Sequence, residues 1–213
     1  MAHPAIEQTS CNKSLVEVAK KILGHNIELQ HSKLNAKPQK DEGDGLIPWH
    51  QDFPFFPHTN TDLLACGIHL DEELVDSGPM EFLEGSHKLG ILSHIHADGT
   101  FAGECTEYEI MKKFPLNTMT VPKGAVSFHS SLALHRSAPK KNNLQRRLIV
   151  FQYRATDAAQ LAGVIWECTG RQVDGIASSD RLSFARFNIP GTIELRAKGG
   201  RLYDVKARLA PNK

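Results

Sequence analysis

Apolar residues recur along the chain with two spacings, which predict one early helix and many short strands. Between Lys13 and Leu23 they fall three or four residues apart, the spacing of one helix face. Asn12 before this segment and Gly24 after it are residue types that begin and end helices. From Ile27 to Ala36 apolar and polar residues alternate, which predicts a strand.

Further strands are predicted along most of the remaining chain, separated by charged, Pro-containing or Gly-containing turns. They are Leu46–Phe53, Leu63–Leu70, Met80–Leu83, Thr118–Pro122, Ala125–His129 and Arg147–Arg154, and the tail adds Ser183–Asn188 and Thr192–Lys206, with Gly199-Gly200 as a hairpin turn. For residues 88–115 we expect an irregular insertion with a short helix. Many short strands joined by turns favour a β-sandwich or barrel.

Composition limits the kind of protein this is. A chain of 213 residues is long enough for one domain with a substantial core. With 25 basic and 24 acidic residues, nothing in the charge points to nucleic acid or a membrane surface. No apolar run reaches membrane-spanning length, the N-terminus is not a signal peptide, and the four cysteines form no Cys-x-x-Cys pair. We therefore expect a cytoplasmic protein without a nucleic-acid or membrane partner; its oligomeric state is not indicated.

The segment His50-Gln51-Asp52, with His135 far along the chain, is the most informative chemical pattern. Two histidines and one carboxylate are the ligands of the facial triad that holds Fe(II) with positions left open. Residues two apart in a strand point to the same face, so His50 and Asp52 could bind one ion while Gln51 turns away. The run that contains Asp52 lies among apolar residues, where an unpaired carboxylate is costly.

Arg146 and Arg147 precede an apolar run that predicts a buried strand. A guanidinium at the head of such a strand can bind a carboxylate through two parallel hydrogen bonds. Strand alternation lets only one of the two arginines point inward, and the spacing from His135 favours Arg146.

Other residues offer alternative sites. His129 could replace His135 as the distal ligand, although it lacks the later Arg at the matching spacing. His94 and His96 could bind a second metal, but a polar loop is the simpler interpretation. A hydrogen-bonded scaffold role is predicted for His58, His69 and His87, core and rim packing for Phe53, Phe55 and Phe56, and a solvated loop for Lys140 and Lys141.

Taken together, the motifs between Ile27 and Ala155 resemble those of the phytanoyl-CoA 2-hydroxylase family of Fe(II)/2-oxoglutarate dioxygenases. The family's His-Gln-Asp is similar to His50-Gln51-Asp52, and its Gly-x6-Gly-Ser-His segment is similar to residues 78–87. Its distal His-x-Ser with a later Arg is similar to His135-Arg136-Ser137 and Arg146.

This resemblance implies a mainly β protein with a double-stranded β-helix (jelly-roll, cupin-like) core and a few flanking helices. It implies His50, Asp52 and His135 as ligands of Fe(II), with 2-oxoglutarate as cosubstrate and O2 as oxidant. The distal carboxylate of 2-oxoglutarate would be held by Arg146 and Ser137.

The same resemblance places Gln51 beside the iron and Lys33 in contact with the cosubstrate. Family chemistry implies hydroxylation of a C–H bond in a small substrate with release of succinate and CO2. Halogenating relatives have a small residue in place of Asp52, so its presence argues against a halogenase.

The chain departs from the family pattern at three positions. Lys140 replaces a frequent Asn, Glu84 replaces a Pro, and Gly67 stands where several members carry a Trp lining the pocket. The Gly predicts a wider pocket, so the family substrate is not inherited; a CoA thioester, an amino acid and a natural-product intermediate stay open.

Members usually have more residues before the strand that carries Lys33, so the single domain expected over residues 1–213 could lack part of the usual N-terminal region. A non-catalytic or 2-oxoglutarate-independent, cupin-like metal-binding protein is the alternative function.

Overall fold

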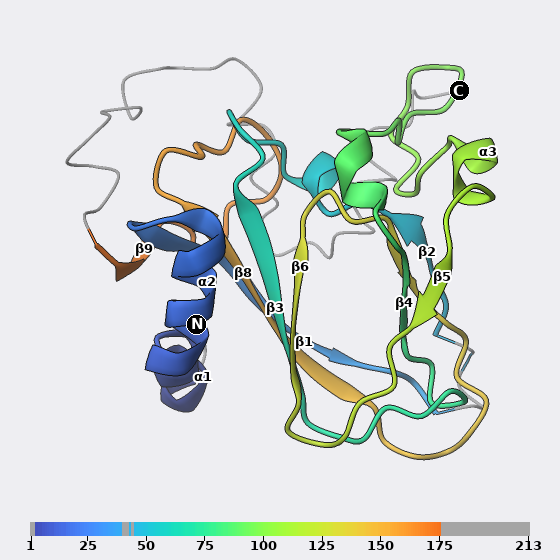
Figure 1. Cartoon of the computed structure of the whole chain (residues 1–213), viewed down its shortest axis with the longest axis horizontal. Helices are drawn as coiled ribbons and strands as arrows, with labels where there is room; N and C mark the ends of the chain where they lie inside the picture. Colours follow the sequence, from blue (N-terminus) through green and yellow to red (C-terminus); the bar gives the residue numbers. More distant parts are fainter. Residues whose placement is uncertain (1–2, 40–42, 44, 176–213) are drawn as a thin grey trace.

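The computed structural model describes residues 3–39, 43 and 45–175, and two antiparallel sheets that face each other dominate it (Figure 1). The larger sheet has the strand order β6 (Val126–Ser130), β3 (Leu63–His69), β8 (Arg147–Ala155), β1 (Ile27–Ala36), β9 (Arg171–Asp174). The smaller sheet has the order β2 (Ile47–His50), β7 (His135–Ser137), β4 (Met80–Leu83), β5 (Leu116–Thr118). This arrangement is a jelly roll, which confirms the predicted fold class.

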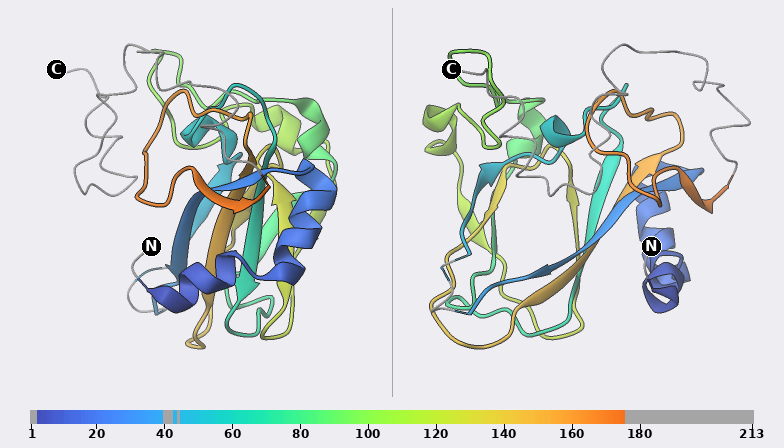
Figure 2. Two further views of the ribbon diagram at one scale, coloured as in Figure 1. Left: turned by 90° about the vertical axis from the view of Figure 1, so that its left-hand side faces the viewer. Right: turned by 180° about the vertical axis from the view of Figure 1, so that it is seen from behind.

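Two helices, α1 (Pro4–Ser10) and α2 (Lys13–Leu23), lie against the outer face of the larger sheet (Figure 2). Helix α2 has the predicted bounds: the Asn12 side chain accepts a hydrogen bond from the Ser14 amide, and Gly24 ends the helix with φ 85°. Helix α1 was not predicted. The described residues contain no helix long and apolar enough to cross a membrane.

Strand β8 is buried on both faces, because one face meets the helices and the other meets the second sheet. On the outer face, Phe151 and Tyr153 join a core that includes Ala19 of α2. On the inner face, Leu148 and Val150 pack with Ala65 and Met80 between the sheets, at the floor of the pocket described below. A strand covered on both sides carries a continuous apolar run, here Leu148 to Phe151, which is why it was recognisable in the sequence.

Sheet register brings the two histidines of the predicted triad together. Strand β2 pairs with β7 so that His50 lies directly opposite His135. On the facing sheet, Lys33 of β1 pairs with Val150 of β8. The fold therefore places side chains from both sheets around one interior space.

Several strand predictions need correction. The predicted metal strand Leu46–Phe53 ends at His50, because Asp52 adopts helical angles (φ −69°, ψ −36°) and begins the 3-10 turn η2 (Phe53–Phe55). The predicted strand Thr118–Pro122 is instead β5, three residues ending at Thr118, followed by an isolated bridge from Val121 to Glu73.

Strands β7 and β9 were missed. The insertion contains the predicted short helix, α3 (Tyr108–Met111), after a 3-10 turn, η3 (Ser86–Leu89). The strands and hairpin predicted between Ser183 and Lys206 lie outside the described residues.

Candidate metal centre and cosubstrate pocket

His50 and His135 are oriented in the same way by the backbone. In each case Nδ1 bonds the carbonyl oxygen two residues earlier, at 2.8 Å to Pro48 and 2.9 Å to Ala133. A carbonyl only accepts, so Nδ1 carries the proton and Nε2 keeps its lone pair. Burial lowers the pKa of both rings, and the neighbouring His50 adds to the effect on His135. The two rings, with centroids 4.2 Å apart, are thus in the form that binds metals.

Asp52 completes a group that could hold one ion. One ligand atom from each of His50, Asp52 and His135 lies within 4.8 Å of the others. The sequence predicted that strand alternation brings Asp52 to the same face as His50. Asp52 instead lies past the end of β2, and a turn brings it close to His50. Burial alone would raise the pKa of the Asp52 carboxyl, but interactions with His129, His135 and Lys33 outweigh it and hold that pKa well below its usual range.

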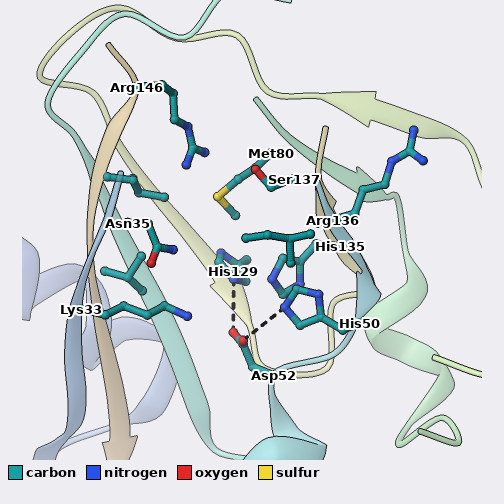
Figure 3. A pocket seen from close by; sticks show the side chains of 13 residues that line it. Lys33, Asn35, His50, Asp52, Met80, His129, His135, Arg136, Ser137 and Arg146 are labelled. Atoms are coloured by element: carbon teal, nitrogen blue, oxygen red, sulfur yellow. Dashed lines mark ion pairs between the residues drawn. The ribbon is translucent and has the colours of Figure 1, made fainter. Parts of the chain in front are cut away.

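His129 and Lys33 surround this group without belonging to it. The Nε2 of His129 lies 3.5 Å from Oδ2 of Asp52, and its ring centroid lies 4.8 Å from that of His135 (Figure 3). The Lys33 side chain points toward the same end of the pocket. His129 is thus a neighbour of the carboxylate, whereas His135 is the histidine grouped with His50 and Asp52.

The other end of the pocket carries Arg146 and Ser137, which also line it (Figure 3). Arg146 is 2% exposed, and its guanidinium points into the pocket. Arg147, the next residue, is turned to the surface, where it forms a two-pronged pair with Asp71. The structure therefore gives the two arginines opposite directions, with Arg146 inward as the strand pattern favoured.

Gln51 is placed differently from the expectation that it sits beside the iron. Its side-chain amide donates to the carbonyls of Gly90 and Leu132, and its oxygen accepts from the Leu92 amide. It is fully buried and is not among the residues that line the pocket. Gln51 therefore connects the insertion to the loop between β6 and β7, behind the metal group. Its side chain does not line the pocket, so the expectation that it binds a cofactor is corrected.

Three further expectations are revised. His94 is a scaffold residue, because its Nε2 accepts from the Gln51 amide and its Nδ1 bonds the Leu92 carbonyl. Lys140 is 2% exposed and is not in a solvated loop. Gly67 does not widen the pocket: a Cβ there would lie 2.8 Å from Ser127 Oγ and 3.1 Å from Leu148 Cδ1, so other side chains already fill the space.

Sequence reasoning missed Glu73, which is 1% exposed and pairs with Arg146. It lies in an acidic turn that resembled a solvated loop, and only its spacing from His69 hinted at a contact. The predicted scaffold role of His69 agrees with its hydrogen bond to Glu73 at 2.7 Å.

Comparisons with known proteins agree with this architecture. The two sheets and the His-Asp-His group between them define a jelly-roll metal site. A family model described as phytanoyl-CoA dioxygenase (PhyH) matches residues 1–148. The chain belongs to the phytanoyl-CoA dioxygenase family.

Two curated relatives and one solved structure illustrate the similarity. The chain is 35% identical over 163 residues to a probable alpha-ketoglutarate-dependent hypophosphite dioxygenase of Stutzerimonas stutzeri, covering 75% of this chain and 56% of that protein. It is 28% identical over 161 residues to the L-proline trans-4-hydroxylase of Streptomyces griseoviridis, covering 66% and 59%. The epimerase SnoN, solved with Fe3+, alpha ketoglutarate and nogalamycin RO, has a TM-score of 0.65 at 21% identity over 74% of this chain and 61% of that one.

The chain thus spans under two thirds of the length of both curated relatives. The likeness to the solved structure supports the fold alone.

Proposed function

We propose that this protein is an Fe(II)- and 2-oxoglutarate-dependent oxygenase that hydroxylates a small substrate. The observation that carries the proposal is one buried pocket with a metal-binding group at one end and an inward arginine at the other. Two histidines with fixed Nε2 lone pairs and one ionised carboxylate match the donor set of non-haem iron oxygenases. The residues present therefore fit the metal that the family implies.

The chain's own residues have separate tasks in this proposal. His50, Asp52 and His135 would hold the iron, which supplies the redox chemistry that activates O2. Arg146, with Ser137 beside it, would bind the distal carboxylate of 2-oxoglutarate, because a guanidinium presents paired N–H donors to a carboxylate.

Lys33 lines the pocket at the metal end, where its ammonium would face carboxylate groups held near the iron. The overall reaction consumes 2-oxoglutarate, O2 and a substrate C–H bond, and yields succinate, CO2 and the hydroxylated product.

The substrate we propose is small. The names of the two curated relatives above assign them hypophosphite, which offers a P–H bond in place of a C–H bond, and L-proline; both are small and polar. A panel of these two compounds and phytanoyl-CoA, compared by the increase that each causes in the rate of succinate formation and by the oxidised product formed per succinate, would rank the classes. We also propose that residues 1–213 form one domain. We further propose that the protein acts in the cytoplasm, because all four cysteines are free thiols.

Anaerobic titration tests the proposal directly. Adding 2-oxoglutarate to the Fe(II)-loaded protein should produce the weak visible absorption of the chelate, and admitting O2 with a substrate should yield succinate. His135→Ala serves as the matched control and should give neither signal. A protein that binds iron but shows no absorption change and forms no succinate would instead support a cupin-like metal protein that uses no 2-oxoglutarate.

A further inference from the structure

Arg146 is the end of a series of four contacting side chains, three of them buried, that the predicted site does not explain. Its Nη2 donates to Glu73 Oε2 at 3.2 Å, and its Nε lies 3.0 Å from Glu73 Oε1. The same Oε1 lies 2.7 Å from His69 Nδ1, and His69 Nε2 lies 3.0 Å from Ser127 Oγ. Arg146, Glu73 and His69 are at most 2% exposed.

The four residues come from separate parts of the jelly roll. His69 ends β3, Glu73 follows in the turn toward β4, Ser127 lies in β6, and Arg146 immediately precedes β8. A chain of contacts across these elements ties the inward arginine to the rigid strands of the larger sheet.

Gly67 makes room for this chain. It pairs with Ser127 across the sheet, and a Cβ at this position would come within 2.8 Å of the Ser127 oxygen. A side chain here would displace Ser127 from His69. The absence of a side chain at Gly67 therefore leaves room for the Ser127–His69 contact.

The opposite charges of Glu73 and Arg146 favour a fixed orientation of the guanidinium. Burial alone would raise the pKa of the Glu73 carboxyl, but the hydrogen bond with His69 and the charge of Arg146 outweigh it and keep that pKa below its usual value. An ionised carboxylate then faces Arg146. A guanidinium has five N–H donors, so one edge can pair with Glu73 while the other edge serves a second carboxylate.

We propose that Ser127, His69 and Glu73 are positioning residues that hold the Arg146 guanidinium in the orientation needed to bind the distal carboxylate of a 2-oxo dicarboxylate. The inference rests on the proposed function, because it assumes that Arg146 is the cosubstrate clamp. It adds that the affinity for the cosubstrate depends on the series of contacts Arg146–Glu73–His69–Ser127, called the relay below, which extends to β6.

The test compares two acid-to-amide changes that are two residues apart. Glu73→Gln removes the charge that faces the inward Arg146, while Asp71→Asn does the same to the surface Arg147. Binding is measured without turnover, in the anaerobic Fe(II) protein, for 2-oxoglutarate and for 2-oxobutanoate. The second compound keeps the 2-oxo acid group but lacks the distal carboxylate.

Glu73→Gln should weaken 2-oxoglutarate binding roughly tenfold, the scale of one charge-assisted hydrogen bond, and leave 2-oxobutanoate within about twofold. Asp71→Asn should change neither. Ser127→Ala, a milder change that should fold even if Glu73→Gln does not, should weaken 2-oxoglutarate binding alone by roughly two- to fivefold.

Unchanged or tighter 2-oxoglutarate binding in Glu73→Gln would overturn the relay, as would an equal loss for both compounds or an equal effect of Asp71→Asn. With Glu73→Gln unfolded, an unaltered affinity in Ser127→Ala would do the same. A wild-type protein that binds no 2-oxoglutarate would instead refute the proposed function, so the two failures can be told apart.

Discussion

At the scale of single residues, the backbone prepares the metal group before any ion arrives. In His50 and in His135, Nδ1 donates a hydrogen bond to the carbonyl oxygen two residues earlier, which fixes both the ring orientation and the tautomer. Asp52 is kept ionised in a buried place by its neighbours. The site therefore needs little reorganisation to take up a divalent ion.

Loss of either histidine should therefore abolish stoichiometric iron binding. His50→Ala and His135→Ala each remove one of three protein donors, and two donors hold a divalent ion poorly. His129→Ala is the matched control, because its ring lies beside Asp52 but outside the group of three. Iron per chain is measured after anaerobic reconstitution and desalting. Full iron occupancy in His135→Ala together with loss in His129→Ala would move the distal ligand to His129.

The sequence showed some residues of this site and hid others. His50, Asp52 and His135 could be found because a short motif and a matching distant motif carry their chemistry. Glu73 could not, because its role depends on a turn folding back under Arg146, and an acidic turn looks the same whether solvated or buried. Strand alternation turned Gln51 away from the metal face; the expectation that it sits beside the iron came from the resemblance, and its side chain does not line the pocket.

At the scale of elements, patterns were informative where burial is regular. Helix α2 and strands β1 and β4 have the predicted bounds. Strands β7 and β9 are three and four residues long and consist mostly of polar residues, unlike the largely apolar β4, so no hydrophobic pattern marks them. The register of β8 matters most for function, because it decides which of two adjacent arginines faces the pocket.

Arg146→Ala should raise the apparent KM for 2-oxoglutarate by roughly tenfold to 150-fold, corresponding to about 1.5–3 kcal/mol for a charge-assisted pair. Arg147→Ala should have a much smaller effect, because that side chain pairs with Asp71 at the surface. Arg146→Ala also leaves Glu73 buried without its partner, so Arg146→Lys is included to keep the charge but not the two-pronged geometry. Steady-state kinetics with iron content checked in each variant decides the matter; a larger effect from Arg147→Ala would contradict the observed register.

At the scale of the whole molecule, the two-sheet arrangement followed from the resemblance more than from strand counting, because the sequence does not say which strands become neighbours.

A second buried polar network ties the described C-terminal segments to the larger sheet. Arg154 pairs with Glu28 at 2.8 Å, and His58 lies 3.0 Å from Gln30, which in turn donates to Gln160. This network holds the end of the barrel without touching the pocket.

His58 makes that network sensitive to acid. Burial and the nearby charge of Arg154 lower the pKa of His58 to about 4, although its hydrogen bond to the Phe56 carbonyl opposes the shift. The unfolded chain binds a proton on this ring near pH 6.5, so between these values the unfolded state takes up more protons than the folded one. The stability that the neutral ring contributes is complete above pH 6.5 and is lost as the pH falls toward 4, by at most about 1.4 kcal/mol per pH unit.

The expected result is that His58→Gln loses less unfolding free energy than the wild-type protein between about pH 7.5 and about pH 5. Urea unfolding at both pH values measures it. Gln160→Ala is the control, because it removes a hydrogen bond of the same network without removing a titrating group. That variant should be less stable by the same amount at both pH values. Equal acid sensitivity of His58→Gln and the wild-type protein would show that the His58 ring takes up its proton in the folded state as readily as in the unfolded chain.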